Sequence, residues 1–343
     1  ILRADGFPTG LLGTIEYDDG GHTQRAPLTT PEPHELSGWL AAMVRRGTTH
    51  AVVELSSHAL HQGRCDGMAL GVAVITNLTQ DHFDYHGGFA DYTAAKARIL
   101  ELCQSGGCVV WNADDDRVRA MVENCDQRIE AVSFGIETSA DVSVVMREET
   151  LASTCFQIRF PDGKDLEIRT GLVGRHNVLN CLAAAVAARA MGASTSGIVK
   201  GIASLDGVPG RLEPIRCGQP FEVFVDYAHT DDALRRAITQ LRRLTVGKVI
   251  CVFGAGGDRD ASKRTLLGRA GATADLAIVT SDNPRSEDPR RIVEDVAAGA
   301  VATGGAPRMV VDRKEAIVEA IASAAPGDSV LVAGKGHETV QVI

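Results

Sequence analysis

The stretch that decides the fold is Lys248-Val-Ile-Cys-Val-Phe253, which is followed directly by Gly254-Ala-Gly-Gly-Asp-Arg259. Its five consecutive apolar residues have the length and composition of a strand that is buried on both faces. The glycine-rich turn leads into residues 262–273, where apolar residues recur at helical spacing. A buried strand, a turn and a helix in this order predict one unit of a parallel sheet with crossover helices.

The same alternation extends in both directions through the C-terminal part of the chain. Strands are predicted at 222–226, 248–253, 275–280, 308–311 and 328–333. Helices are predicted between them at 231–244, 262–273, 289–302 and 313–324. This is the pattern of a Rossmann-like domain, in which loops at the carboxyl ends of the strands contact the ligands.

The N-terminal part shows the alternation less regularly. Strand-like apolar runs occupy 51–55, 71–76 and 107–111. Segments with apolar residues at helical spacing occupy 35–46, 89–103, 116–124 and 176–191. Residues 141–170, with a turn at Pro161-Asp-Gly163, predict a small antiparallel β element instead. We therefore expect an α/β protein whose first domain has a mainly parallel sheet. The Pro209-Gly210 hinge divides it into domains 1–208 and 209–343.

The composition narrows the class of protein. A net charge of −9 argues against a nucleic-acid partner, because such proteins need a surplus of Lys and Arg. No apolar run approaches the roughly 20 residues that cross a bilayer, and no signal peptide opens the chain. The eight cysteines form no C-x-x-C pair, which favours reduced, buried thiols over a disulfide framework or a zinc site. We expect a cytoplasmic protein that binds neither membrane nor nucleic acid.

The first chemical cluster is Ala51-Val-Val-Glu54-Leu-Ser56-Ser57-His58. A carboxylate at the end of an apolar strand is costly to bury unless it binds a cation or hydrogen-bond donors. Metal ligation by Glu54 and a simple capped strand end explain this pattern equally well.

The second cluster is Thr76-Asn-Leu-Thr-Gln-Asp-His82-Phe-Asp-Tyr-His86, at the end of the next predicted strand. His82 and His86 have the i, i+4 spacing of a zinc pair, but no third ligand with suitable spacing follows. A magnesium site that uses one His and Glu54 is better supported, because hard cations prefer oxygen ligands. We interpret His86, which precedes two glycines, as a loop residue.

Lys96 lies on the next predicted helix, in Tyr92-Thr-Ala-Ala-Lys96. A helical Lys is usually a solvated surface charge. In the company of the two preceding clusters, a second interpretation is a lysine carbamate, which would supply a carboxylate to Mg²⁺. Such a site needs an amine whose pKa is lowered by burial or nearby positive charge.

These segments and others, in order, resemble the Mur ligase family, and within it the diaminopimelate-adding branch. The resemblance covers essentially the whole chain, and ten segments in register make it specific although each motif alone is weak. The matching segments are Leu28-Thr-Thr-Pro, Glu54-Leu-Ser-Ser-His, Asn77-Leu-Thr-Gln-Asp-His, Ala94-Ala-Lys96, Gly174-Arg-His-Asn177-Val-Leu-Asn180, Pro209-Gly-Arg211, Val225-Asp-Tyr-Ala-His229, Gly254-Ala-Gly-Gly-Asp-Arg259, Ser281-Asp-Asn-Pro-Arg285 and Ala333-Gly-Lys-Gly-His-Glu338.

The resemblance implies an ATP-dependent amide-bond ligase of peptidoglycan precursor synthesis. Such an enzyme adds meso-diaminopimelate to the D-glutamyl γ-carboxylate of UDP-N-acetylmuramoyl-L-Ala-D-Glu through an acyl phosphate, and we expect it to be a monomer. The implied ligands of the UDP-muramyl-dipeptide are Thr29, Thr30, Ser56, Gln62 and Arg64. Mg²⁺ would be held by Glu54, His82 and the carbamate of Lys96, and ATP by Asn177, Arg211 and Asp226. Lys96, Glu54, His82 and Arg211 would together form the catalytic set.

The same resemblance places amino-acid selection in the second domain. Pro284 stiffens its loop, so that the guanidinium of Arg285 is presented as a bidentate clamp for a carboxylate that lysine lacks. An ion pair between Arg285 and Asp288 is the plainer alternative. Glu338 would receive the distal ammonium. The implied diaminopimelate pocket consists of Arg259, Asp282, Asn283, Pro284, Arg285, Gly334 and Glu338.

One departure from the family concerns the phosphate loop. The pattern G-x-x-x-x-G-K-[ST] is absent from these residues, because Gly254-Ala-Gly-Gly lacks the Lys-Thr ending. We interpret the central domain as incomplete and expect this stretch alone to lack activity. A catalytically silent binding protein of the same fold, an L-lysine-adding ligase and a folylpolyglutamate-type ligase are the alternatives.

Overall fold

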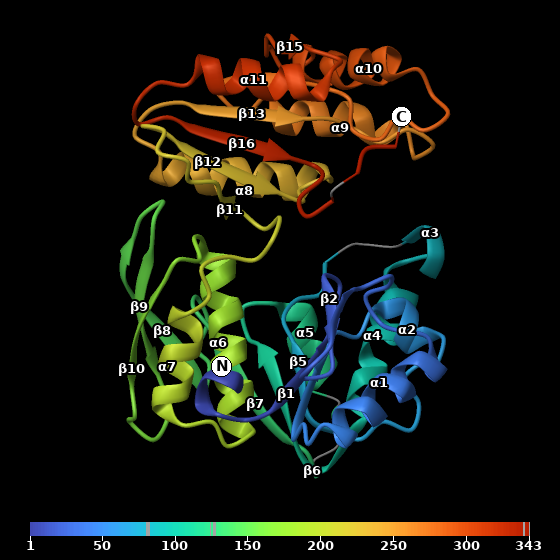
Figure 1. Ribbon diagram of the computed structural model, residues 1–343, viewed down its shortest axis with the longest axis vertical. Helices are drawn as coiled ribbons and strands as arrows, with labels where there is room; N and C mark the ends of the chain where they lie inside the picture. The colour runs from blue at the N-terminus through green and yellow to red at the C-terminus, as the bar shows by residue number, and fades with distance from the viewer. Residues whose placement is uncertain (80–82, 124, 126–127, 339, 343) are drawn as a thin grey trace. The chain divides into compact units, whose positions relative to one another are not determined.

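The computed structural model describes residues 1–79, 83–123, 125, 128–338 and 340–342. The described chain forms two compact units, the first made of Ile1–Glu148 and Ser153–Asp206, and the second of Glu149–Ala152 and Gly207–Ile343. The first unit has two sheets and the second has one, and Figure 1 shows the two units with their helices. Each unit has its own hydrophobic core. The change of unit at 206/207 falls beside the Pro209-Gly210 hinge.

The first unit begins with a four-stranded sheet of order β3-β2-β1-β4. Its strands are β1 (Thr9–Leu12), β2 (Glu16–Asp18), β3 (Thr23–Arg25) and β4 (His50–Val53). β1 pairs with β4 in parallel, whereas β1–β2 and β2–β3 are antiparallel. Helix α1 (Pro33–Arg45) packs on this sheet through Leu36 and Met43, and the short helix α2 (Ser57–His61) follows β4.

A second sheet of the first unit has the order β10-β9-β8-β7-β6-β5. Its strands are β5 (Leu70–Ile75), β6 (Cys103–Asn112), β7 (Glu130–Gly135), β8 (Val142–Glu149), β9 (Thr154–Arg159) and β10 (Leu166–Thr170). β5 to β8 run in parallel, and β9 and β10 form an antiparallel hairpin. The expected β element at 141–170 is thus an extension of the parallel sheet, because β8 pairs with β7.

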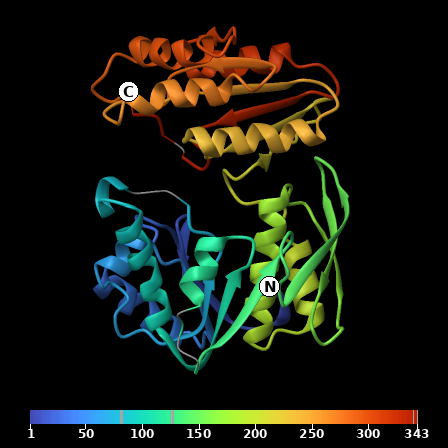
Figure 2. The same cartoon turned by 180° about the vertical axis from the view of Figure 1, so that it is seen from behind.

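Helices cover this second sheet on both faces. They are α4 (Phe89–Glu101), α5 (Asp116–Val122), α6 (Arg175–Ala190) and α7 (Thr195–Ala203), and the short helix α3 (Phe83–His86) packs against α4. α4 and α5 share one core with β5 and β6, through Tyr92, Val118 and Val109. Figure 2 shows α6 and the N-terminal segment, which includes the 3-10 helix η1 (Arg3–Asp5), beside α7. There Asp5 accepts a hydrogen bond from the backbone N–H of Ser194 at 2.6 Å.

The second unit is a six-stranded sheet between two layers of helices. The strand order is β11-β12-β16-β13-β14-β15, with β11 (Glu213–Pro214), β12 (Glu222–Asp226), β13 (Val249–Phe253), β14 (Leu276–Val279), β15 (Arg308–Met309) and β16 (Ser329–Ala333). Its helices are α8 (Asp231–Leu244), α9 (Ser262–Gly271), α10 (Pro289–Val301) and α11 (Arg313–Ser323). α8, α9 and α10 pack on one face and α11 on the other (Figure 1). All contacts except β11–β12 are parallel, so the expected Rossmann-like fold is confirmed.

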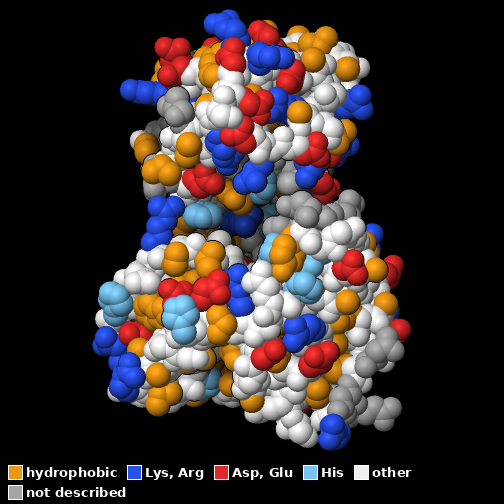
Figure 3. Space-filling view, turned by 90° about the vertical axis from the view of Figure 1, so that its right-hand side faces the viewer, with side chains coloured by type: hydrophobic (Ala, Val, Ile, Leu, Met, Phe, Trp, Pro, Cys, Tyr) orange, Lys and Arg blue, Asp and Glu red, His pale blue; other side chains and the backbone are white. Residues whose placement is uncertain are grey.

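Charges of both signs are interspersed over the face of the molecule shown in Figure 3. Within the described ranges, no helix is both long and apolar enough to cross a membrane.

Candidate functional site

The carboxyl ends of β1 and β4 bring Glu54 and Thr14 together. The two strands are adjacent and parallel, with Leu12 opposite Val53, so the residues that follow them emerge side by side. One carboxylate oxygen of Glu54, Oε2, accepts hydrogen bonds from the backbone N–H and the hydroxyl of Thr14, both at 2.8 Å. Glu54 therefore has hydrogen-bond donors, as a carboxylate at a strand end requires.

Hydroxyl groups from a neighbouring loop complete this polar edge. Thr30 is buried, and its hydroxyl donates to the carbonyl of Glu54 at 2.8 Å while accepting the backbone N–H of Ser56 at 3.0 Å. The hydroxyl of Thr29 lies 3.1 Å from that of Thr14. Three predicted substrate ligands, Thr29, Thr30 and Ser56, therefore lie next to Glu54.

The remaining two predicted ligands of the UDP-muramyl-dipeptide lie at the same edge. Nε of Arg64 donates to the side-chain oxygen of Gln62 at 2.7 Å, and Nη1 of Arg64 donates to the carbonyl of Thr30 at 3.3 Å. Glu32 pairs with the same guanidinium at 3.1 Å. All five residues thus form one continuous group, which we call the β4 edge: Thr29, Thr30, Ser56, Gln62 and Arg64.

His86 differs from its expected place in a loop. It ends α3, only 6% of it is exposed, and its Nε2 lies 3.0 Å from the hydroxyl of Ser57. Its ring contacts the ring of Tyr92 on α4, with centroids 5.5 Å apart. This buried packing needs no metal, so His86 is a core residue that ties α3 to α2 and α4.

Lys96 lies one turn along α4 from Tyr92. Its Nζ is 5.9 Å from the centroid of the Tyr92 ring, and the residue is half-buried. The packing of Ser57, His86 and Tyr92 therefore connects the β4 edge to Lys96. The third predicted metal ligand, His82, lies outside the described residues.

The residues at this edge fit Mg²⁺. Among the described residues, no group of three or more His, Cys, Asp or Glu side chains is placed to hold a metal. Magnesium does not need such a cage, because it keeps several water ligands and commonly takes one or two carboxylates from the protein. Glu54, with hydroxyl groups around it, supplies a donor set of that kind.

Asn177, the predicted adenine ligand, lies in the first turn of α6 and is 5% exposed. Its side-chain amide donates to the carbonyl of Val173 at 2.8 Å and its oxygen accepts from Asn180 at 3.4 Å. These contacts fix the turn that enters α6.

In the second unit, Asp226 organises the residues around Arg211. Its two carboxylate oxygens accept the backbone N–H groups of Leu212 and Ala228, each at 2.7 Å. The guanidinium of Arg211 lies 5.3 Å from the centroid of the Tyr227 ring. Asp226 and Arg211 are therefore held next to each other at the end of β12.

Four of the predicted diaminopimelate ligands meet at the carboxyl ends of β14 and β16. Asn283 donates through Nδ2 to Glu338 at 3.3 Å, and a Cβ added at Gly334 would lie 2.9 Å from Oδ2 of Asp282. Gly334 also has φ 109°, which favours glycine. We call these residues, together with Lys335, the Asn283 cluster: Asp282, Asn283, Gly334, Lys335 and Glu338.

Arg285 adopts the left-handed conformation, with φ 55°, which is uncommon for a residue with a side chain. Its Nη1 donates to the carbonyl oxygens of Gly257 at 2.6 Å and Asn283 at 3.4 Å. Asp288 is engaged elsewhere, because it caps α10 through the N–H of Arg290. The plainer alternative of an Arg285–Asp288 ion pair is therefore not what the structure contains.

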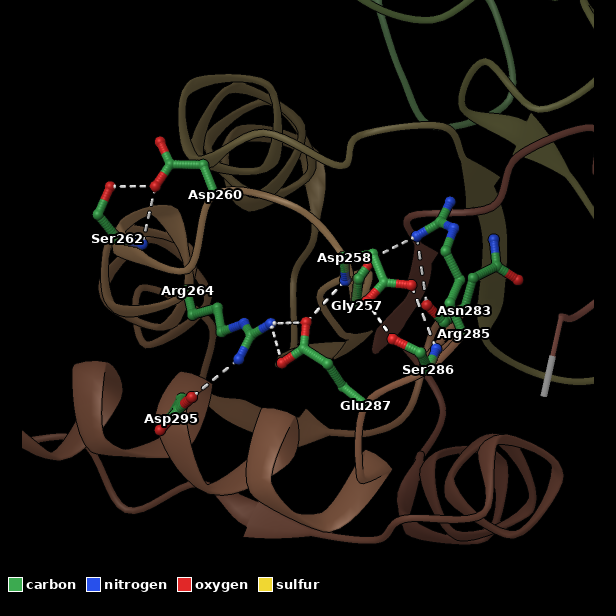
Figure 4. A network of polar contacts seen from close by, with 10 residues as sticks. All are labelled: Gly257, Asp258, Asp260, Ser262, Arg264, Asn283, Arg285, Ser286, Glu287 and Asp295. Carbon is green, nitrogen blue, oxygen red and sulfur yellow. Dashed lines mark hydrogen bonds and ion pairs between the residues drawn. The ribbon is translucent and has the colours of Figure 1, made fainter.

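A network of ion pairs and hydrogen bonds joins the loops around Arg285 (Figure 4). Arg264 donates to both oxygens of Glu287, at 2.7 and 2.8 Å, and Glu287 accepts the N–H of Asp258 at 2.6 Å. Asp258 in turn accepts the hydroxyl of Ser286 at 2.5 Å. Hydrogen bonds from Arg264 and the N–H of Asp258 hold the pKa of Glu287 below its usual value, so the network stays charged at neutral pH. The predicted ligand Arg259 lies in the loop that this network anchors.

Two residues that contact the predicted site residues were not predicted from the sequence, Thr14 and Lys335. Thr14 escaped because the short strand before it was not predicted. Lys335 carried a signal, since it stands between two glycines in Gly334-Lys-Gly336, and a buried lysine in such a turn is unusual.

Comparison with known proteins identifies the class. The Mur ligase middle domain matches residues 1–188, and the Mur ligase glutamate ligase domain matches residues 210–336. These two domains in this order define an ATP-dependent amide ligase. The chain belongs to the Mur ligase family, as its motifs predicted.

Individual members of the family are similar to this chain over its whole length. The UDP-N-acetylmuramoyl-L-alanyl-D-glutamate–2,6-diaminopimelate ligase of Solibacter usitatus is 43% identical over 348 residues, which cover 100% of this chain and 69% of that protein. The ligase of the same name from Geobacillus kaustophilus is 43% identical, with 100% and 71% covered. A solved structure of a ligase of that name has a TM-score of 0.71 and 33% identity, covering 100% of this chain and 70% of the other. Folylpolyglutamate synthase of Mycobacterium tuberculosis, at 19% identity and TM-score 0.73, shares the fold.

Proposed function

We propose that this protein is a meso-diaminopimelate-adding ligase of peptidoglycan precursor synthesis. The observation that carries the proposal is 43% identity, over the whole chain, to ligases of that name. The Asn283 cluster and Arg285 support it, because they gather two carboxylates and two cations at one sheet edge. An amino-acid head with both charges would find partners for each of them there.

The reaction has two chemical steps. The γ-phosphoryl group of ATP passes to the D-glutamyl γ-carboxylate of UDP-N-acetylmuramoyl-L-Ala-D-Glu, which gives an acyl phosphate and ADP. The amino group of diaminopimelate then attacks the acyl carbon, the tetrahedral intermediate expels phosphate, and the amine loses a proton as the amide forms. Neither step needs a covalent enzyme intermediate, so the protein contributes mainly positioning and charge neutralisation.

The residues of the first unit bind and orient the nucleotide-linked substrate. In this proposal the hydroxyls of the β4 edge and Arg64 hold the phosphates and carboxylates of the UDP-muramyl-dipeptide. Glu54, His82 and the carbamate of Lys96 would hold Mg²⁺, which when bound would neutralise charge on the ATP phosphates. Asn177 would contact ATP from this unit, and Arg211 and Asp226 are the predicted ATP ligands of the second unit.

In the second unit, Arg285 would bind the distal carboxylate of diaminopimelate in a bidentate clamp. Glu338 would accept its distal ammonium, and Asp282, Asn283, Pro284, Gly334 and Arg259 would shape the surroundings. Lys335 keeps Glu338 ionised. Burial alone would raise the pKa of Glu338, but the hydrogen bond and charge of Lys335 hold that pKa below its usual value.

The test is a product assay with the complete gene product. It would be incubated with UDP-N-acetylmuramoyl-L-Ala-D-Glu and ATP, and with meso-diaminopimelate, L-lysine or neither, and the products identified by mass spectrometry. We expect a UDP-muramyl-tripeptide and one phosphate per amide with diaminopimelate. Preferential use of L-lysine would make it a lysine-adding ligase, and binding without any product would make it a silent relative.

A further inference from the structure

Lys335 is a buried lysine in a turn built from two glycines. Gly334 has φ 109° and Gly336 has φ 49°, and a Cβ added at Gly336 would lie 2.7 Å from Cβ of Tyr227. Side chains are thus excluded on both sides of Lys335. Lys335 itself is 9% exposed, which is unusual for a lysine and calls for partners.

The partners of Lys335 are two residues expected to receive the substrate. Its Nζ donates to Oδ1 of Asn283 at 2.9 Å and to Oε2 of Glu338 at 2.8 Å. The backbone N–H of Val342 also donates to Oδ1 of Asn283, at 2.9 Å. The ammonium of Lys335 therefore uses one carboxylate oxygen of Glu338, Oε2, and compensates part of the negative charge that a ligand ammonium would meet there.

Charges of both signs surround Lys335. Asp282 and Glu338 supply carboxylates, Asp226 adds a third on the neighbouring strand, and Arg285 and Arg313 supply two further cations.

Arg313 is 9% exposed, and its guanidinium donates a hydrogen bond to the carbonyl of Ala333, directly before Gly334, at 2.7 Å. Burial lowers the pKa of Arg313, and the nearby carboxylates of Asp282 and Glu338 act against that shift. These positions place Arg313 on the same sheet edge as the Asn283 cluster.

We propose that Lys335 is a specificity-determining residue that excludes amino acids whose distal end is a bare cation. A lysine side chain would place a second ammonium beside Lys335, where the charge of Glu338 is already partly compensated. The distal head of diaminopimelate carries its own carboxylate and so adds no net charge. The inference rests on the proposed function. Arg285 would attract the distal carboxylate of diaminopimelate, and Lys335 would in addition repel the distal ammonium of L-lysine.

The experiment measures kcat/KM for meso-diaminopimelate and for L-lysine in variants of the complete gene product. Lys335→Met removes the cation at similar length. Asn283→Asp keeps the size of the side chain and leaves Lys335 an oxygen partner, but it replaces the Nδ2 donor to Glu338 with an oxygen and changes the local charge by −1. In both variants the ratio of kcat/KM for diaminopimelate to kcat/KM for L-lysine should fall by about tenfold or more. The absolute kcat/KM for L-lysine should rise.

Two matched variants control for charge and for damage. Lys335→Arg keeps the cation and should keep the ratio, and Lys314→Met makes the same change at an exposed position of α11 and should also leave it unaltered. If Lys335→Met fails to fold, Asn283→Asp alone decides. A kcat/KM for L-lysine that does not rise in whichever of Lys335→Met and Asn283→Asp folds would overturn the inference, because a lower ratio alone could come from weaker diaminopimelate binding. If the unsubstituted protein does not use diaminopimelate at all, the proposed function is overturned instead.

Discussion

The guanidinium of Arg285 donates a hydrogen bond to the carbonyl oxygen of Gly257, with Nη1 and O 2.6 Å apart. This contact joins the loop after β14 to the glycine-rich turn after β13. A Cβ added at Gly256 would lie 2.9 Å from the same Nη1, so a side chain at this position would displace the guanidinium. Both hydrogen bonds of Arg285 to described residues use Nη1, which leaves the Nε and Nη2 edge available for the proposed carboxylate clamp.

Replacing Arg285 with Ala should therefore remove a fixed carboxylate clamp. We expect kcat/KM for diaminopimelate to fall about a hundredfold, which corresponds to about 3 kcal/mol for a lost charge-assisted hydrogen-bond pair. Steady-state kinetics with diaminopimelate as the varied substrate would measure this. Arg290→Ala, at an exposed position of α10, is the matched control. Equal use of lysine and diaminopimelate by the unsubstituted enzyme would contradict the role of Arg285.

Lys96→Ala should abolish activity if the lysine carries the carbamate. The carbamate would supply a carboxylate to Mg²⁺, so its loss removes a metal ligand rather than a base. Short carboxylic acids added to Lys96→Ala should restore part of the activity, because they can enter the space left by the side chain. The exposed Lys200→Ala is the control. A fully active Lys96→Ala enzyme would refute the carbamate.

Thr14→Val tests the hydrogen bond that orients Glu54. The substitution keeps the shape of the side chain and removes the hydroxyl donor, while the backbone N–H of residue 14 remains. A lost hydrogen bond to a charged group costs about 1.5–3 kcal/mol, so the concentration of Mg²⁺ for half-maximal activity should rise about tenfold or more. A Mg²⁺ titration of activity measures it, with Thr23→Val on the exposed strand β3 as the control. An unchanged Mg²⁺ requirement would separate Thr14 from metal binding.

The second unit was the easier one to predict from sequence. β12 and α8 have the predicted bounds, because a short apolar run with charged flanks and an amphipathic helix capped by Thr230 are both strong local signals. α7 was missed although Ser194 caps it and Ile198 and Ile202 are both buried in it. Gly197 and Gly201 lie within it, and because glycine is disfavoured inside helices the segment does not have the composition of one.

The first unit was harder because much of its sheet structure carries little hydrophobic signal. β3 is fully exposed, and β6 begins at Cys103 with the polar and glycine-rich stretch 104–107, where an apolar run cannot be seen. The strand expected at 51–55 was correct as a strand, but β4 belongs to a different sheet from β5. Sheet membership depends on pairing with β1, far away in sequence, which local patterns do not encode.

The site could be predicted in its residue types but not in its internal contacts. The structure places Glu54, Ser56 and Asp282, which were predicted from polar residues at strand ends, next to other predicted residues, and their roles stay predictions. The contact of Lys335 with Glu338 could not be predicted, because it depends on the backbone angles of two glycines rather than on a helical i, i+3 spacing.

Asp114 provides a test of stability against pH. It follows β6, and its oxygens accept the N–H groups of Ile136 and Thr138, both at 2.8 Å, and of Glu137 at 3.1 Å. Burial would raise the pKa of Asp114, but these hydrogen bonds and the hydroxyl of Thr138 outweigh it and hold that pKa below the usual 3.8. The folded state therefore binds this proton less readily than the unfolded state.

It follows that the stabilisation from Asp114 is fully present above pH 3.8 and is lost as the pH falls through the lowered folded-state value. Asp114→Asn should lower the free energy of unfolding by about 1–3 kcal/mol at pH 7, because donors that face the carboxylate would meet an amide group. The difference between the two proteins should shrink below pH 3.8. Urea unfolding at several pH values, with the exposed Asp165→Asn as the control, measures it. A difference that stays constant down to pH 3, about a unit below the usual value, would mean that the charge of Asp114 contributes nothing to stability.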